Sequence, residues 1–302
     1  MIKPILKPDC HPPAKQRLLH LSLSCLGLFW MVGTPATAHE FWVEPSAFQP
    51  QIGDTITADL VIGTDFLGAS AIYVPDQIER FAVIAANDDA APDNATPDDA
   101  EMLITGRYGD RPAGTFSVSM PGVNIILHQT APLYLTYASA DKFTAFVTEK
   151  GYPEAVVQHQ RRGLSLDKIT ERYQRFAKSL ITVGPAARNG DRVLGLRYEV
   201  LAETNPYRHP APATMTVRVL ADGLPVAGTQ VTVFTRDNPR RVDRKNYITD
   251  AAGRIEFAVQ TGRDYLVDAV RLLPIDDAAE PRGAVWESLW ASLVFHVPSA
   301  GP

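Results

Sequence analysis

The chain has 302 residues and a formal net charge of −5, with 29 Lys and Arg against 34 Asp and Glu. A mildly acidic chain without a basic stripe is not suited to wrapping nucleic acid or an anionic membrane surface, so we expect neither as a partner. Its length is enough for two domains of ordinary size, each with its own hydrophobic core.

The N-terminal segment has the layout of a secretory signal peptide. Four basic residues precede an apolar run at 21–33, and the small residues Ala36, Thr37 and Ala38 follow that run. A basic start, an apolar stretch and a small-x-small site are typical of a peptide that is removed after export. An apolar run of about a dozen residues is short for a membrane-spanning helix. We therefore predict that residues 1–38 are a signal peptide and that the cleaved protein is not inserted in a membrane.

Both cysteines of the chain, Cys10 and Cys25, lie in this predicted signal peptide. Lipidation of Cys25 is disfavoured, because Ser22 stands where a lipoprotein usually has an apolar residue. Once the peptide is removed, the protein has no cysteine for a disulfide or a thiolate site. Any metal must then be held by nitrogen and oxygen ligands.

Beyond residue 38, alternating apolar and polar residues predict β-strands. In the segment 55–63, for example, Ile56, Leu60 and Ile62 fall on one face. The acidic, proline-bearing segment 87–99 predicts a loop. Further strands are expected at 78–86, at 114–129 with a turn at Pro121-Gly122, and at 133–138, 192–202, 214–220, 230–234, 255–259, 265–273 and 289–297.

Two segments depart from the alternation and predict helices. Residues 142–150 indicate a short helix that Gly151 ends. Residues 165–180 indicate a longer one, with Ser165 as its N-cap, Asp167 in its first turn and an apolar stripe that would pack against a sheet. We therefore predict a helical insertion at about 141–181.

Short strands at regular spacing, separated by turn residues, predict an all-β fold of two immunoglobulin-like β-sandwich modules. The first module is expected at residues 39–203 and contains the helical insertion. A proline-rich linker is expected at 204–213, and the second module at 214–302.

Several motifs of the chain are found together in one known family. They are HEFWVEP at 39–45, ERYQRFAKSL at 171–180, the segment 196–207, the turns at 222–225 and 249–253, and WESLWA at 286–291. In this combination the chain resembles a bacterial periplasmic family of unknown function, long labelled the periplasmic component of ABC-type nickel/cobalt transport. The resemblance covers nearly all of the chain beyond residue 38. It implies a periplasmic, β-rich, metal-associated protein, with a metal-uptake transporter of the cell envelope as its partner.

Cleavage after Ala38 would make His39 the first residue of the mature protein. Its α-amine and imidazole could then close a chelate ring on a transition metal ion, which no internal histidine can do. An α-amine with a pKa near 8 yields its proton readily to a competing metal. The common amino-terminal copper and nickel motif needs histidine as the third residue, and Phe41 stands there instead.

The second ligand is expected to be His128, which follows the apolar run 123–127. The alternative is that His128 is an ordinary buried histidine of a strand and binds no metal. Glu40 or Glu44 could supply an oxygen ligand to the metal or accept a hydrogen bond that orients the His39 imidazole. Alternatively, both glutamates face water while Phe41 and Trp42 anchor the first strand in the core. The remaining histidines rank lower, because they lie beside arginines, between prolines or on an outward face: His159, His209 and His296.

The chain lacks a G-x-S-x-G elbow, an H-E-x-x-H motif and a phosphate-binding loop, so we predict that it is not an enzyme. The leading hypothesis is a transition-metal-binding protein accessory to uptake; nickel or cobalt is favoured by the resemblance and copper by the chelate geometry. The first alternative is a structural or partner-binding β-sandwich protein of the cell envelope without a metal. The second is a copper oxidase that acts on polysaccharide through a histidine brace.

Overall fold

The computed structural model describes residues 39–86, 101–184, 190–238 and 241–299. The predicted signal peptide at 1–38 and the predicted loop at 87–99 lie outside the described residues. All described residues belong to one unit of the chain, residues 35–302. None of the helices in this described part is long and apolar enough to cross a membrane.

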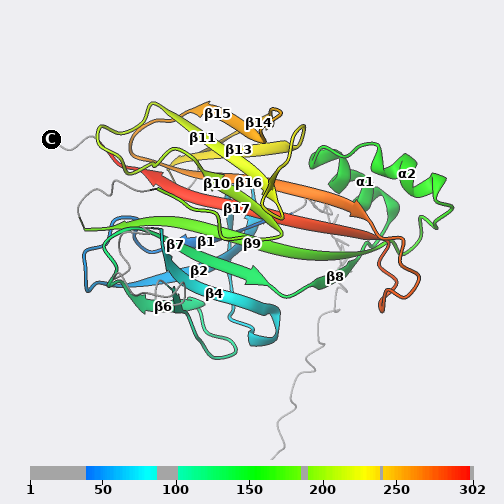
Figure 1. The fold of residues 1–302 in the computed structure, drawn as a ribbon. Coiled ribbons are helices and arrows are strands. Elements are labelled where there is room, and N and C mark those ends of the chain that lie inside the picture. The colour runs from blue at the N-terminus through cyan, green and yellow to red at the C-terminus, as the bar shows by residue number, and fades with distance from the viewer. Residues whose placement is uncertain (1–38, 87–100, 185–189, 239–240, 300–302) are drawn as a thin grey trace, which may run out of the picture. The chain divides into compact units, whose positions relative to one another are not determined.

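A nine-stranded sheet runs through the middle of the fold (Figure 1). Its two central strands, β9 (Thr170–Val183) and β17 (Trp286–Val297), pair in parallel, whereas its other strand pairs are antiparallel. On the β17 side follow β16 (Arg263–Pro274), β13 (Gln230–Asn238) and β14 (Arg241–Ile248). On the β9 side follow β7 (Gly122–Thr130), β4 (Ile78–Ala85) and β5 (Glu101–Leu103), and β8 (Leu133–Thr136) also pairs with β9.

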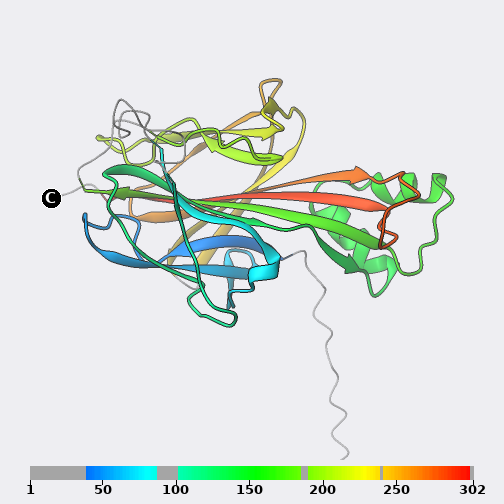
Figure 2. The same ribbon diagram turned by 60° about the horizontal axis from the view of Figure 1, so that its bottom comes forward.

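A four-stranded sheet covers each face of this central sheet, as Figures 1 and 2 show. The N-terminal sheet contains β1 (Glu40–Pro45), β2 (Thr55–Thr64), β3 (Leu67–Ala71) and β6 (Gly114–Ser117). The C-terminal sheet contains β10 (Tyr198–Ala202), β11 (Thr214–Ala221), β12 (Leu224–Pro225) and β15 (Arg254–Ala258). A short 3-10 turn, η1 (Pro75–Gln77), precedes β4.

The central strands are therefore buried on both faces. Along β9, Ile181 and Val183 face the core under the N-terminal sheet, while Phe176 and Leu180 face the core under the C-terminal sheet. The prediction of an all-β fold with sandwich-like packing is confirmed, and strands form in each segment where they were predicted. Strand pairing continues across the predicted linker at 204–213, because β9 pairs with β17 and β10 pairs with β11. The division into two modules stays a prediction.

Two short helices, α1 (Ala140–Glu149) and α2 (Ala155–Arg161), pack at one end of the central sheet. Phe143 and Phe146 of α1 pack there against Trp286 and Trp290 of β17. The predicted helix at 142–150 is confirmed. It ends where predicted, because Gly151 has a φ of +87°, a left-handed conformation that side-chain-bearing residues rarely adopt.

The predicted helix at 165–180 is wrong, and the helical insertion ends at Arg161 rather than near residue 181. Residues 170–183 form β9 instead. The prediction was wrong because residues three apart, such as Tyr173 and Phe176, would share one face of a helix. In the strand they point to opposite faces, and both faces are covered. When both faces of a strand are covered, apolar residues need not alternate with polar ones. Pairing with β7 and β17 along most of its length then outweighs the helix propensity of the segment.

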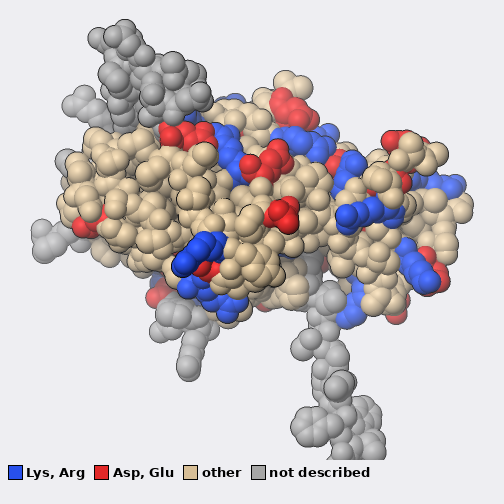
Figure 3. All heavy atoms as spheres, turned by 90° about the horizontal axis from the view of Figure 1, so that it is seen from below, with Lys and Arg blue, Asp and Glu red and all other residues tan. Residues whose placement is uncertain are grey.

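Charged side chains of both signs are interspersed on the face shown in Figure 3, rather than gathered by sign. Several surface cations have an acidic neighbour, as in the ion pairs Arg80–Glu101 and Arg254–Glu203. Exposed pairs of this kind contribute little to stability, about 0–1 kcal/mol each.

Candidate functional site

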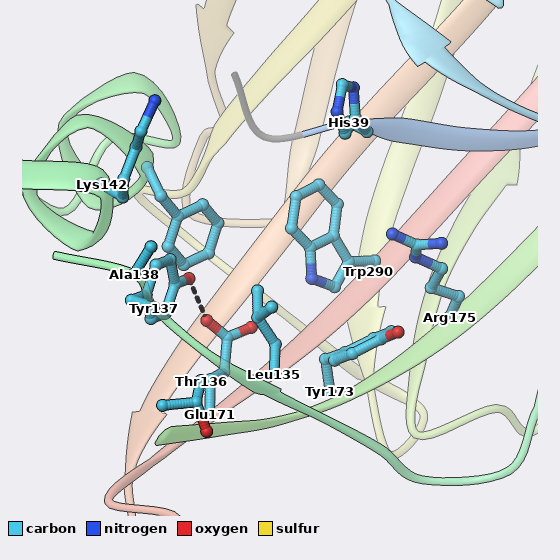
Figure 4. Close-up of a pocket in the computed structure, with 11 residues that line it drawn as sticks. His39, Leu135, Thr136, Tyr137, Ala138, Lys142, Glu171, Tyr173, Arg175 and Trp290 are labelled. Atoms are coloured by element: carbon cyan, nitrogen blue, oxygen red, sulfur yellow. Dashed lines mark hydrogen bonds between the residues drawn. The ribbon is translucent and has the colours of Figure 1, made fainter. Parts of the chain in front are cut away.

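A cavity of about 420 Å³ opens on the face of the central sheet, between the start of β1 and helix α1 (Figure 4). We call it the β9 pocket. Its size lies within the range of small-molecule sites. The described residues that line it come from the start of β1, β8 and the turn after it, α1, β9 and β17: His39, Leu135, Thr136, Tyr137, Ala138, Lys142, Phe146, Glu171, Tyr173, Arg175 and Trp290.

Strand β9 presents Glu171, Tyr173 and Arg175 to the pocket because alternate residues of a strand share a face. Further along the same face, Ala177 and Ile181 lie in the core beneath the N-terminal sheet. That sheet begins only at Glu40, so the cavity occupies the part of the face between the sheet and α1. The parallel register of β9 and β17 places Trp290 opposite Arg175.

Glu171 is almost fully buried and accepts two hydrogen bonds. The Tyr137 hydroxyl donates to Oε2 and the Ser288 hydroxyl donates to Oε1. Trp290 in turn donates from Nε1 to the Ser288 oxygen, at 2.8 Å. Burial raises the pKa of Glu171 to about 7, although the two hydroxyls and Arg175 act in the opposite direction. This carboxyl group therefore titrates near neutral pH.

The Arg175 guanidinium forms no ion pair with a carboxylate of the described residues, although Glu171 and Asp268 act in the direction of raising its pKa. Its guanidinium carbon lies 5.1 Å from the ring centroid of Tyr173, 5.2 Å from that of Phe41 and 5.9 Å from that of Trp290. Its Nε is buried and has no hydrogen-bond partner there. Burial lowers the pKa of this guanidinium, but an arginine remains charged in such a site. The side chain is turned toward Trp290 (Figure 4).

A buried ion cluster fixes the wall of the pocket beside Trp290. Lys150 Nζ lies 2.9 Å from Glu40 Oε1 and 3.0 Å from Asp268 Oδ2, and it stands 4.9 Å from the Trp290 ring centroid. Burial raises the pKa of Glu40 to about 7, while Lys150 lowers it and Asp268 raises it. The cluster joins the start of β1 and the end of α1, two elements that line the pocket, to strand β16.

The two predicted metal ligands lie in different surroundings. His39 is exposed at the rim of the β9 pocket, with Nδ1 at 3.2 Å from the Thr64 hydroxyl oxygen. His128 is only 2% exposed, and its ring packs at 5.2 Å from those of Phe41 and Phe81. Burial, and then Arg175, lower the pKa of His128 to about 3, so its imidazole is neutral. His128 is not among the described residues that line the pocket.

The predicted supporting carboxylates have other partners. Glu40 is 1% exposed and belongs to the Lys150 cluster. Glu44 accepts a hydrogen bond from Trp42 Nε1 at 2.8 Å and pairs with Arg236. The prediction that Phe41 and Trp42 anchor the first strand in the core is confirmed, but the alternative that both glutamates face water is wrong for Glu40.

The lower-ranked histidines with described side-chain contacts also have partners within the fold. His159 is fully buried; its Nδ1 accepts from Trp286 Nε1 at 3.1 Å, and its Nε2 donates to the Ser165 carbonyl oxygen at 2.8 Å. His296 Nδ1 lies 2.8 Å from Asp264 Oδ1. Within the residues that the structure describes, no three or more His, Cys, Asp or Glu side chains are grouped to hold a metal ion.

Sequence reasoning did not single out Glu171, Arg175 or Tyr137, and it used Trp290 only as part of the motif at 286–291. A signal was present in the sequence, since Glu171, Arg175 and Lys178 stand among apolar residues in the motif at 171–180. In a helix these charges would lie along a solvated face. In a buried strand each of these charged side chains requires a hydrogen-bonding or charged partner, so their presence there indicates either an ion cluster or a binding site.

The fold and the pocket define an all-β protein with a small-molecule-sized cavity beside the start of its first described strand. Residues 36–271 match the family described as a domain of unknown function (DUF4198), and the chain belongs to that family. No curated protein sequence matches the chain. The predicted membership of a family of unknown function is confirmed, whereas the nickel/cobalt transport label stays a prediction.

Proposed function

We propose that the protein is exported to the periplasm, processed after Ala38, and binds a transition metal ion through the α-amine and imidazole of His39. In this role it would be an accessory to nickel or cobalt uptake, with copper as the alternative metal. One observation carries the proposal: exposed His39 at the pocket rim is followed directly by four buried residues, 40–43. A terminus created there would be held in place by the first strand instead of fraying.

The chemistry of the donors suits such an ion. Amine and imidazole nitrogens are borderline ligands that bind nickel, cobalt and copper well. Lys142 and Arg175 line the same pocket and oppose a bound cation, and the Glu171 carboxylate partly offsets them. His39 alone supplies two donors, which leaves the remaining coordination positions to water or to a ligand in the pocket. His128 would join the site only by leaving its packing between Phe41 and Phe81.

The test is calorimetric titration of the exported protein with Ni²⁺, Co²⁺ and Cu²⁺, after intact mass spectrometry has established its first residue. We expect heat of binding for at least one metal. An added methionine before His39 keeps the imidazole but displaces the amine, so it should abolish binding, as should His39→Ala. His128→Phe fills the same aromatic packing and should preserve binding if His39 alone chelates. Flat titrations with all three metals on correctly processed protein contradict the proposal.

A second candidate is a partner-binding protein of the cell envelope that holds no metal. It is favoured by exposed apolar side chains on the two edge strands of the central sheet, Leu103 of β5 and Ile248 of β14. Edge strands offer unpaired backbone groups to another chain. Under this candidate, the methionine-extended protein behaves like the processed one in every assay. The copper oxidase stays a prediction, tested by peroxide-dependent release of oxidised sugars from polysaccharide.

A further inference from the structure

We propose that the β9 pocket binds a small organic carboxylate with an apolar, preferably aromatic, body, and that Arg175 pairs with its carboxylate group. This inference goes beyond the proposed metal site and does not depend on it. It rests on the partners of the cations in the fold, on the side chains that form the walls of the cavity, and on the charges among the residues that line it.

Two lysines of the fold are fully buried. Lys150 lies against Glu40 and Asp268, and Lys178 lies against Asp191 and Glu199, so each lysine has two carboxylates. Arg175 contacts three aromatic rings and no carboxylate within the described residues. Arg175 is partly buried, its Nε is shielded from water without a partner, and Glu171 and Asp268 act on it only at longer range, without an ion pair. A charge that is partly removed from water is stabilised by a paired anion, so we expect a ligand in the pocket to supply that anion. A guanidinium binds a carboxylate through two parallel hydrogen bonds.

The walls of the pocket select the rest of the ligand. Tyr173 and Trp290 rise from the central sheet, Phe146 stacks on Trp290 at 5.6 Å, and Leu135 and Tyr137 close the side toward β8. Apolar and aromatic walls around one cation favour a ligand that has a flat apolar body and one anionic end.

The other charges that line the cavity favour an anionic organic ligand over a ligand amine. His39 and Lys142 are the further basic residues of the described lining, and Glu171 is its single carboxylate. Both oxygens of Glu171 already accept hydrogen bonds, from Tyr137 and Ser288. A ligand amine would therefore find an engaged acceptor, whereas a ligand carboxylate finds an unpaired donor.

The experiment titrates the full exported chain, freed of metal with EDTA, at near-neutral pH in a calorimeter. The probes are phenylacetate, its uncharged counterpart phenylacetamide, acetate and phenyl phosphate. We expect phenylacetate to bind at least about tenfold more tightly than phenylacetamide, because hydrogen bonds to a charged group contribute about 1.5–3 kcal/mol. Acetate lacks the apolar body and should bind more weakly than phenylacetate. Equal affinity for phenylacetamide and phenylacetate overturns the proposal, and tighter binding of phenyl phosphate overturns the carboxylate class.

Matched variants locate the binding. Arg175→Met should weaken phenylacetate binding at least about tenfold. Arg172→Met removes a guanidinium from the opposite face of the same strand, where Arg172 pairs with Glu287, and should change binding less than about twofold. Equal effects of these two variants contradict the site.

Two further variants test the inference if Arg175→Met does not fold and separate it from the metal proposal. Glu171→Gln removes the negative charge that the pocket carries above about pH 7, so at about pH 8 it should tighten phenylacetate binding relative to the wild type, a gain that damage to the fold would not produce. If Arg175→Met fails to fold, an unchanged or weakened affinity in Glu171→Gln overturns the proposal. His39→Ala should abolish metal binding yet keep phenylacetate binding within a few-fold, which separates a failure of this inference from a failure of the metal proposal.

Discussion

The two faces of β9 carry cations in different surroundings: Lys178 is fully buried among carboxylates, whereas Arg175 is partly buried among aromatic rings. Lys178 Nζ lies 2.8 Å from Asp191 Oδ1 and 3.0 Å from Glu199 Oε1. Backbone N–H groups of Ala202 and Leu194 also donate to these carboxylates. Arg175, three residues earlier and on the opposite face, has aromatic rings around it and no carboxylate among the described residues. Lys178 is paired within the protein, so its role is structural. Arg175 has no such ion pair, and we propose above that it pairs with the carboxylate of a ligand.

The largest effect is expected for Lys178→Met. This change leaves Asp191 and Glu199 buried beside each other without their cation, and breaking a buried ion pair costs about 3–5 kcal/mol. Denaturant unfolding at neutral pH would measure the loss in the free energy of unfolding. Arg172→Met is the control, and we expect it to lose less than about 1 kcal/mol, because Glu287 keeps its ion pair with Arg197. Equal losses in the two variants would mean that the Lys178 cluster is not a structural ion cluster.

The next effect concerns pH and Glu171. Its pKa is about 7 in the folded protein, against an ordinary value of 4.5. The folded state thus binds this proton more tightly than the unfolded state. Its contribution to stability is complete below about pH 4.5 and is lost as the pH rises through about 7. A shift of this size corresponds to about 3 kcal/mol, because each pKa unit equals about 1.4 kcal/mol.

Glu171→Gln should therefore lose less stability than the wild type between about pH 5 and pH 8. The free energy of unfolding, measured at a series of pH values in both proteins, checks this difference. The groups that face Glu171 are Tyr137, Ser288 and Arg175, and they remain in the variant. Glu40 also has a pKa near 7, but it titrates in both proteins, so the difference between the two curves isolates Glu171. Parallel curves would show that Glu171 does not titrate in this range.

The smallest effect on stability is expected for Arg175→Met. The change removes three cation–π contacts, each of which contributes about 0.5–2 kcal/mol. It also removes a partly buried charge that has no ion pair with a carboxylate of the described residues, which offsets that loss. We expect the free energy of unfolding to change by less than about 1 kcal/mol, measured beside Lys178→Met under the same conditions. A loss as large as that of Lys178→Met would make Arg175 a structural residue and would remove the contrast between the two faces.

Predictions from the sequence were confirmed where a local pattern was compatible with only one type of secondary structure. The alternation in 55–63 predicted β2, and Gly151 marked the end of α1. The same reasoning failed at residues 165–180, where an apolar spacing fitted a helix as well as a strand covered on both faces. Glu171 and Arg175 were missed for the same reason, since the role of a charge at these positions depends on which element carries it.

Composition, residue alternation and turn residues alone determined that the chain is all-β, and the motif that begins at His39 contributed to the resemblance that indicated its family. The local preferences of the backbone depend on neighbouring residues, so short segments of sequence are enough to predict these features. Tertiary structure alone decided that β9 lies between two covering sheets, that Glu171 meets Ser288 from 117 positions away, and that Arg175 meets no carboxylate among the described residues. Burial and charge pairing depend on such distant partners, and so the chemistry of the pocket emerges only when the strands assemble.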